Sequence, residues 1–160
     1  MGFRCDNGIN RKRRLRIARM NSICPKCAVD PTSHSFKKVA EKNGVTLYYT
    51  HPSKSKLYDD KEGILNHIDN MLMLQKGKPW SLILDGDGYD VRHAAQVDIG
   101  VSLMDLMMQK HGANMKEFTI INPTWHIHAQ LKVASMKLSR ELFAKIVVLE
   151  DRKRSVLEFL

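Results

Sequence analysis

The sequence contains no apolar run approaching the roughly 18 residues that a membrane-spanning helix needs. Arginines stand near the N-terminus, but no apolar stretch of about 7–15 residues follows them, so we expect no secretory signal. The 3 cysteines are too few and odd in number for a disulfide scaffold, which favours a reducing compartment, the cytosol or the nucleus. Because 43% of the 160 residues are hydrophobic, collagen-like and wholly disordered chains are excluded and one globular core is expected.

Motifs typical of catalytic and nucleotide-binding sites are also missing. There is no GxSxG, no P-loop and no GxGxxG. The histidines of the second part of the chain have no acid or nucleophile at a fixed offset, and His126 and His128 would face different directions on a helix. We therefore expect no catalytic residues, no cofactor and no enzyme activity.

Positive charge is concentrated at the N-terminal side. Residues 1–43 hold 11 Lys and Arg against 3 Asp and Glu, whereas residues 44–160 hold 15 against 14. This division predicts a basic, poorly ordered arm over residues 1–43 and a nearly neutral domain over residues 44–160. Nucleic acid is a partner to consider for the arm, not for the domain.

The densest charge in the arm is Arg11-Lys12-Arg13-Arg14-Leu15-Arg16, followed by Arg19. Like charges this close repel one another along a short helix, so the segment is expected to be mobile until it meets an anion. Nucleic-acid phosphates, anionic lipid headgroups and a nuclear-import receptor all suit such a run, and so does a solvated tail with no partner.

The arm also contains a CxxC motif, Cys24-Pro25-Lys26-Cys27. Its spacing suits two thiolates on one tetrahedral zinc ion, but a closed site needs a second pair of ligands. The local candidates are Cys5 and His34, whose spacings fit no standard zinc ribbon. A redox CxxC would follow a strand and open a helix, which these flanks do not predict. We expect reduced thiols and no metal, with zinc left as the open alternative.

The hydrophobic pattern of the domain alternates between strands and helices. Short β-branched and apolar runs predict strands at residues 45–50, 81–84, 118–121 and 146–149. Helical spacing predicts helices near residues 64–75, 97–108 and 125–138. Strands separated by helices are typical of crossover connections on a parallel sheet, so the expected fold class is α/β with a mostly parallel sheet.

Two carboxylates follow the second of these strands, in the run Asp85-Gly86-Asp87-Gly88. An apolar strand followed by Asp-x-Asp resembles the nucleophile and acid of haloacid-dehalogenase-like, Mg²⁺-dependent phosphatases. The later acidic pair that this family needs is matched only by Glu150-Asp151, which three basic residues follow. Asp85 and Asp87 are therefore expected to serve as loop and cap residues, with the phosphatase kept as an alternative.

The ordered set of motifs resembles the CRAL-TRIO family of lipid-binding domains. The set consists of Trp80-Ser-Leu-Ile-Leu-Asp85-Gly-Asp-Gly88, an apolar helix, Phe118-Thr-Ile-Ile-Asn122-Pro123-Thr124-Trp125, an amphipathic helix and Lys145-Ile146-Val147-Val148. The Asn-Pro-Thr-Trp segment is close to the His-Pro-Thr-Trp of the family's Rho-GAP and BCH branch. The likeness covers about residues 44–160. Two parts of the family have no counterpart in this sequence, the helical lobe that precedes the domain and a later segment that closes the pocket, so a truncated member is expected.

The resemblance implies a hydrophobic pocket between the sheet and a mobile gate helix, matched here by about residues 127–138. Independently of the family, helical spacing places an apolar stripe on this segment and a second one on the preceding helix. The residues expected to line a lipid pocket are Ile127, Leu131, Ala134, Leu138, Met104 and Met108. The residues expected to meet a membrane are Lys132, Val133, Met136 and Arg140.

These observations favour a non-catalytic domain for the binding, or the binding and transfer, of a phospholipid or another hydrophobic small molecule at an anionic membrane surface. The expected location is the cytoplasm, peripheral to membranes. A BCH-type protein-interaction module without lipid is the alternative from another class.

Overall fold

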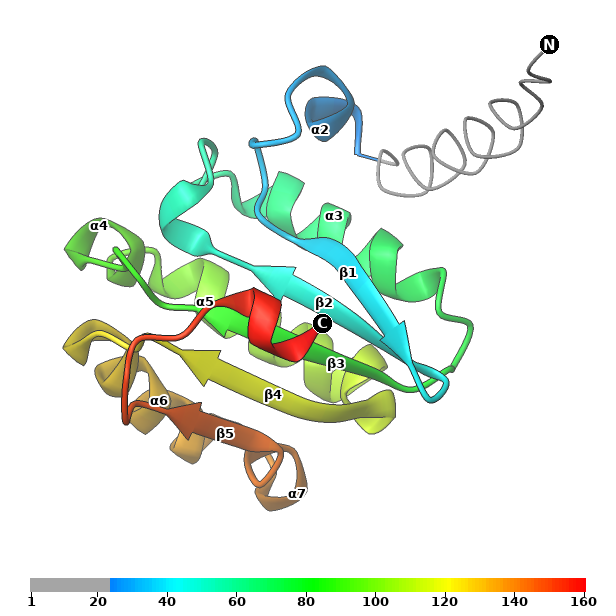
Figure 1. The fold of residues 1–160 in the computed structure, drawn as a ribbon. Coiled ribbons are helices and arrows are strands. Elements are labelled where there is room, and N and C mark those ends of the chain that lie inside the picture. The colour runs from blue at the N-terminus through cyan, green and yellow to red at the C-terminus, as the bar shows by residue number, and fades with distance from the viewer. Residues whose placement is uncertain (1–23) are drawn as a thin grey trace, which may run out of the picture.

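A computed structural model of the chain describes residues 24–160, and a single five-stranded sheet forms its centre (Figure 1). The strands lie in sequence order across the sheet. The first pairs with the second in antiparallel orientation, and all later pairs are parallel. The strands are β1 (Lys37–Lys42), β2 (Val45–Thr50), β3 (Trp80–Asp85), β4 (Met115–Ile121) and β5 (Ile146–Leu149).

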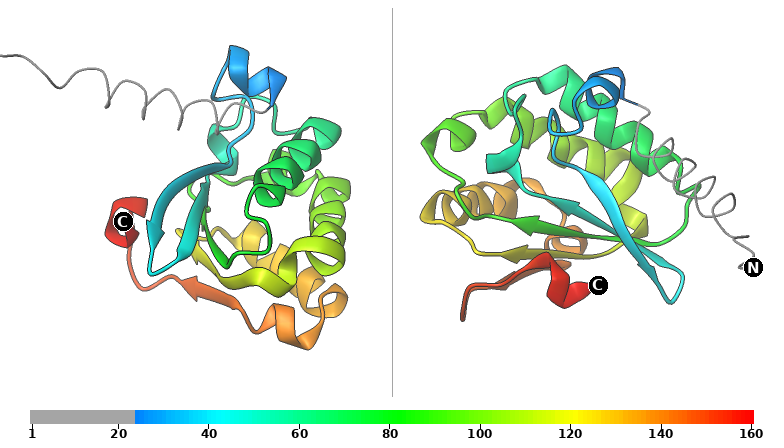
Figure 2. Two further views of the ribbon diagram at one scale, coloured as in Figure 1. Left: turned by 90° about the vertical axis from the view of Figure 1, so that its right-hand side faces the viewer. Right: turned by 45° about the horizontal axis from the view of Figure 1, so that its top comes forward.

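The three long helices cover one face of this sheet (Figure 2, left). They are α3 (Lys61–Met73), α5 (Val97–Leu106) and α6 (Trp125–Lys137). Each belongs to a crossover between neighbouring parallel strands. Because the crossovers are all right-handed and the strand order advances in one direction across the sheet, all three helices lie on the same side. The opposite face carries a short 3-10 helix, η4 (Val156–Phe159), next to the C-terminus (Figure 1).

Shorter elements complete the connections. They are α2 (Pro25–Val29), η1 (Pro52–Lys54), α4 (Val91–Ala94), the π-helix η2 (Met107–His111) that continues α5, η3 (Gly112–Asn114) and α7 (Arg140–Phe143). No helix in residues 24–160 has the length and apolarity that crossing a membrane requires.

The main core lies between the sheet and α3. Phe36 stacks on Tyr48 with ring centroids 4.9 Å apart, and Tyr48 meets the edge of Trp80 at 6.1 Å. The Tyr48 hydroxyl donates to the backbone carbonyl of Met71, so its polar group is satisfied although the ring is buried. The same cluster contains Met71, Leu72, Met115 and Leu142.

The structure confirms the α/β class and the mostly parallel sheet predicted from the sequence. The predicted strands near residues 81–85, 118–122 and 145–149 are neighbours in the sheet and pair in parallel. Helices connect them, which is the physical reason that parallel pairing was expected.

The expected boundary at residue 44 differs from the structure. Residues 37–42, assigned to a poorly ordered arm, form the edge strand β1, and the boundary falls within the hairpin turn between β1 and β2. Asn43 and Gly44 both have positive φ, 53° and 77°, as a two-residue hairpin of the Asn-Gly type requires. Lysines 37, 38 and 42 thus lie on an edge strand, where positive charge opposes pairing with other chains. The expected arginine cluster at residues 11–19 lies outside the described residues.

Candidate functional site

A cavity of about 310 Å³ lies between the sheet and the helices that cover it. Alternation along the strands brings every second side chain to this space, because successive residues of a strand point to opposite faces. The sheet contributes Leu82 and Leu84 from β3, Phe118 and Ile120 from β4, and Ile146 from β5. These residues make the sheet wall of the cavity apolar.

Helix α6 forms part of the opposite wall. Ile127, Leu131, Ala134 and Leu138, the stripe expected to line a pocket, all line this cavity. Ile127 and Ala134 are buried and the two leucines are half-buried. Spacings of three and four residues keep them on one side of the helix.

Helix α5 supplies another part of that wall, but the side of the helix that faces the cavity is rotated from the side that was expected. Of the two methionines expected to line a lipid pocket, Met104 lines this cavity, whereas Met108 does not and 41% of its surface is exposed. The lining side runs instead through Ile99, Leu103 and Met107. Asp98, Ser102 and Asp105 lie four and three residues apart and form the polar side of α5, and the lining side lies opposite them.

One end of the cavity is polar. The polar lining residues are His34, Ser35, Thr50, Ser55, Tyr58, Tyr89, His93, Gln96 and Gln130. Most of them follow the carboxyl ends of β2, β3 and β4, and the first two precede β1, whose start lies beside the end of β2 because the pair is antiparallel. The carboxyl ends of parallel strands are the usual place for ligand-contacting groups in open α/β sheets. Sequence reasoning missed these residues because most of them come from loops and short helices without periodicity.

Aromatic rings organise this polar end. The ring of His93 lies 5.2 Å from that of Tyr89 and 5.1 Å from that of Tyr58, measured between centroids. His93 also accepts from the backbone N–H of Asp90 at 3.2 Å, which closes the capping box of α4 and holds the imidazole in place. Burial raises the pKa of Tyr89, so its hydroxyl stays protonated at neutral pH.

The outer side of α6 combines apolar and basic side chains. Val133 and Met136, expected to meet a membrane, are exposed, Met136 to 81%. Lys132 and Arg140 are exposed as well. Trp125, which was not expected to take part, is 73% exposed at the start of the helix.

Asp85 braces the loop that follows β3. Its carboxylate accepts from the Tyr49 hydroxyl at 3.0 Å, from Asn122 Nδ2 at 3.0 Å and from the backbone N–H of Asp87 at 3.0 Å. Burial, followed by the nearby Asp85 charge, raises the pKa of Tyr49, which keeps that hydroxyl a donor. Asp87 has a 57% exposed side chain that lies 3.9 Å from Lys153. Neither carboxylate belongs to a group of three metal-ligating side chains within residues 24–160.

Gly86 allows this loop to approach α6. A Cβ atom at this position would overlap Ile127 Cδ1 and lie 2.7 Å from the carbonyl oxygen of Asn122. The backbone N–H of Gly86 donates to the carbonyl of Ile121 at 2.8 Å, extending the pairing of β3 with β4. The Asp-Gly pair therefore sets the distance between the strand ends and the helix that lines the cavity.

Comparison with known proteins identifies a fold and no family. No protein-family model matches the sequence, and no curated protein sequence matches it. Among solved structures the chain is similar to the crystal structure of Sfh5, a protein of the CRAL-TRIO family, with a TM-score of 0.62 and 9% sequence identity. The match covers 78% of this chain and 51% of that one, so the chain spans about half the length of Sfh5. The fold is therefore compatible with the CRAL-TRIO resemblance of the motifs.

Proposed function

We propose that this chain binds a hydrophobic ligand with a polar end, of the lipid class, in the cavity between the sheet and α5 and α6, without changing it chemically. The cavity itself carries the proposal. Its walls are apolar along β3, β4, β5 and the two helices, and its polar groups gather at one end. An amphipathic molecule matches that distribution, because its chain removes apolar surface from water while its headgroup keeps hydrogen-bond partners.

The size of the cavity limits the ligand. Ligand pockets typically measure about 300–1,000 Å³, so the cavity, at about 310 Å³, is at the lower end of that range. It has roughly twice the volume of the 150 Å³ apolar cavity that accommodates benzene in an engineered lysozyme. A single acyl chain or a compact apolar molecule suits this space, and a two-chain phospholipid would require α6 to move outward.

The outer side of α6 supports a membrane as the place of exchange. Trp125, Val133 and Met136 expose apolar surface, and Lys132 and Arg140 add positive charge nearby. Aromatic and apolar side chains flanked by cations suit the interface of an anionic bilayer. A helix that lines the cavity with one side and meets the bilayer with the other provides a direct route for the ligand. We accordingly propose a peripheral, cytoplasmic association with anionic membranes.

The experiment that tests the proposal is native mass spectrometry of the full chain as purified, followed by organic extraction and analysis of the extract. We expect a fraction of the protein to carry a mass that disappears under denaturing conditions and that reappears in the extract as one class of lipid. A protein that remains free of extractable ligand, and that takes up no fluorescent fatty acid from vesicles, contradicts the proposal and favours the interaction module. Turnover of a phosphate ester with Mg²⁺, abolished by Asp85→Asn, would favour the phosphatase.

A further inference from the structure

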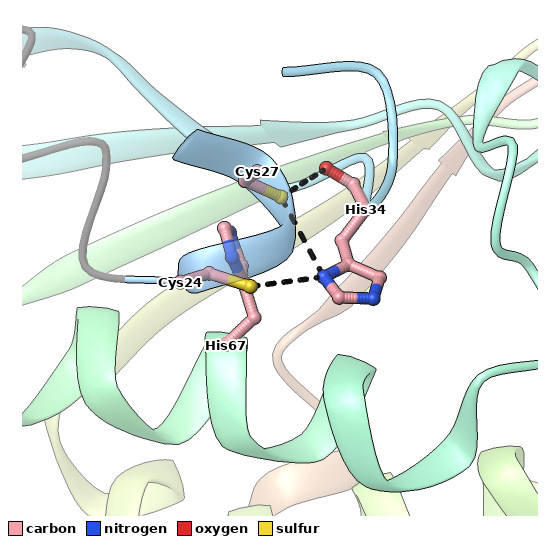
Figure 3. A group of neighbouring side chains, drawn as sticks. All are labelled: Cys24, Cys27, His34 and His67. Carbon is pink, nitrogen blue, oxygen red and sulfur yellow. Dashed lines mark hydrogen bonds between the residues drawn. The ribbon is translucent and has the colours of Figure 1, made fainter. Parts of the chain in front are cut away.

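Four buried side chains from distant parts of the chain meet beside the N-terminal end of the fold (Figure 3). Cys24 and Cys27 come from the start of α2, His34 from the loop before β1, and His67 from the middle of α3. Their potential ligand atoms, two sulfurs and two ring nitrogens, all lie within 4.8 Å of one another. The CxxC motif therefore has a second pair of ligands, which consists of the local candidate His34 and of His67 from a distant helix.

The distances agree with a shared tetrahedral metal ion. Nδ1 of His34 lies 3.4 Å from the sulfur of Cys24 and 3.5 Å from the sulfur of Cys27. Zinc bonds of about 2.3 Å to sulfur and about 2.0–2.1 Å to nitrogen, at the tetrahedral angle, place those two atoms about 3.6 Å apart. Nδ1 of His34 has one lone pair, so it can accept a hydrogen bond from only one of the two thiols that face it. Hydrogen bonding alone therefore does not account for the position of both sulfurs.

The partners of both imidazole rings fix which nitrogen is free to bind. Nε2 of His67 lies 2.8 Å from the carbonyl oxygen of Phe36, and Nε2 of His34 lies 2.8 Å from the Asp60 carboxylate. Both partners accept hydrogen bonds, so each Nε2 carries the proton and each Nδ1 presents a bare lone pair to the cluster. Nδ1 of His67 is buried and has no hydrogen-bond partner among the described residues, although it lies beside two cysteines.

An outer layer of contacts supports this arrangement. Asp60, the N-cap of α3, holds His34 and also accepts from Lys26 Nζ at 2.6 Å. Gly63 lies against both: a Cβ atom there would overlap the Asp60 side chain and come 2.8 Å from Nε2 of His34. Carboxylates and carbonyls that bind the second nitrogen of a histidine are the usual outer partners of zinc ligands.

We infer that Cys24, Cys27, His34 and His67 form a structural Cys₂His₂ zinc site. Four protein ligands leave no open position, and their burial excludes water, as in structural and unlike catalytic zinc centres. Thiolate and imidazole ligands in tetrahedral geometry favour zinc over magnesium or calcium.

The ion would fasten the N-terminal segment to the body of the fold. Within residues 24–36, α2 is a single short helix, whereas α3 packs on the sheet. His34 also lines the polar end of the cavity, so the same ion fixes part of the ligand-binding wall. Metal binding at such a site adds to the stability of the folded state, because the unfolded chain does not hold the ligands together.

The test is the metal content of the full-length chain, purified without chelator and measured by inductively coupled plasma mass spectrometry. We expect about one zinc per chain, and visible absorption of tetrahedral, thiolate-bound cobalt when Co²⁺ replaces it. Cys24→Ser and His67→Gln should each lose the zinc and the cobalt spectrum. Asp60→Ala leaves the four ligands in place and should weaken zinc affinity by about 10–100-fold.

Two control variants separate loss of the site from loss of the fold. His111→Gln changes another buried histidine, one that binds Asp69 and lies away from the cysteines, and should keep the zinc. Cys5→Ser changes the third cysteine and should keep it as well. Chelation of the wild-type chain should lower its Tm, and zinc should restore it. Metal-free purified protein that also fails to bind Co²⁺ after thiol reduction, or a Cys24–Cys27 disulfide in the freshly purified chain, overturns the inference.

Discussion

Asn122 and Arg154 exchange two hydrogen bonds that join the end of β4 to the segment after β5. Nδ2 of Asn122 donates to the carbonyl of Arg154 at 2.9 Å, and the backbone N–H of Arg154 donates to Oδ1 of Asn122 at 2.8 Å. The same Nδ2 donates to Asp85. Asn122 has φ of 50°, a left-handed conformation that Asn tolerates better than most residues. One side chain therefore connects the ends of β3 and β4 with the segment that follows β5.

Replacement of this amide by a carboxylate should destabilise the fold in a pH-dependent way. Asn122→Asp keeps the shape but loses both Nδ2 donations and places a second carboxylate against Asp85. We expect a loss of about 3 kcal/mol in the free energy of unfolding at pH 7, measured in urea. The like charge raises the pKa of the introduced carboxyl group in the folded state, so the loss should shrink as the pH falls towards 4. A loss that does not change with pH contradicts the contact with Asp85.

The two aspartates of the loop after β3 should differ strongly in their contribution to stability. Asp85→Ala leaves the Tyr49 hydroxyl, Asn122 Nδ2 and the N–H of residue 87 without their acceptor, and should cost about 3 kcal/mol. Asp87→Ala removes an exposed side chain and should cost about 1 kcal/mol or less, with ligand binding intact. Equal losses for the two variants, or loss of Mg²⁺ binding in either, would contradict a bracing role and favour the phosphatase.

Filling the cavity should block the ligand without disturbing the rest of the protein. Leu131→Trp adds a bulky ring on the side of α6 that faces the sheet, and should reduce uptake of a fluorescent fatty acid at least 10-fold. Met136→Trp places the same ring on the exposed side of the same helix and should leave equilibrium uptake from aqueous solution unchanged, because no bilayer takes part in that assay. Uptake is measured by fluorescence and folding by circular dichroism. Equal uptake by both variants would place the ligand elsewhere.

The stripe on α6 was predictable because its apolar residues recur at helical spacing. Ile127, Leu131, Ala134 and Leu138 lie three or four residues apart, which places them along one side of a helix, and contact with the sheet selects that side over the one that carries Val133 and Met136. On helix α5 the polar side is formed by Asp98, Ser102 and Asp105, and Met108 lies at the edge of the opposite, cavity-lining side, where 41% of its surface is exposed. The strands of the parallel sheet were predictable because a short β-branched run between two helical segments rarely forms anything other than a strand.

Contacts between residues distant in the chain were beyond the reach of sequence patterns. His67 reaches Cys24 and Cys27 only because α3 packs under α2, and no spacing rule connects these positions. The Asn43-Gly44 turn, by contrast, is a local hairpin signal that lies between two strands. The lysine content of β1 led to its assignment to a charged arm, although an edge strand tolerates lysine well.

Charge reversal on α6 and α7 should weaken binding to anionic membranes. If Val133 and Met136 enter the interface, Lys132 and Arg140 meet the headgroups, and each cation contributes about 1 kcal/mol near the surface. The double variant Lys132→Glu, Arg140→Glu should therefore bind vesicles containing phosphatidylserine at least 30-fold more weakly in a sedimentation assay, with an unchanged circular dichroism spectrum. The pair Lys42→Glu, Lys78→Glu changes net charge equally at exposed positions on other elements and should have a much smaller effect. If vesicle binding is lost only when the basic residues at 11–19 are neutralised, that cluster is the membrane contact. If neither region binds vesicles, the result favours a protein-interaction module.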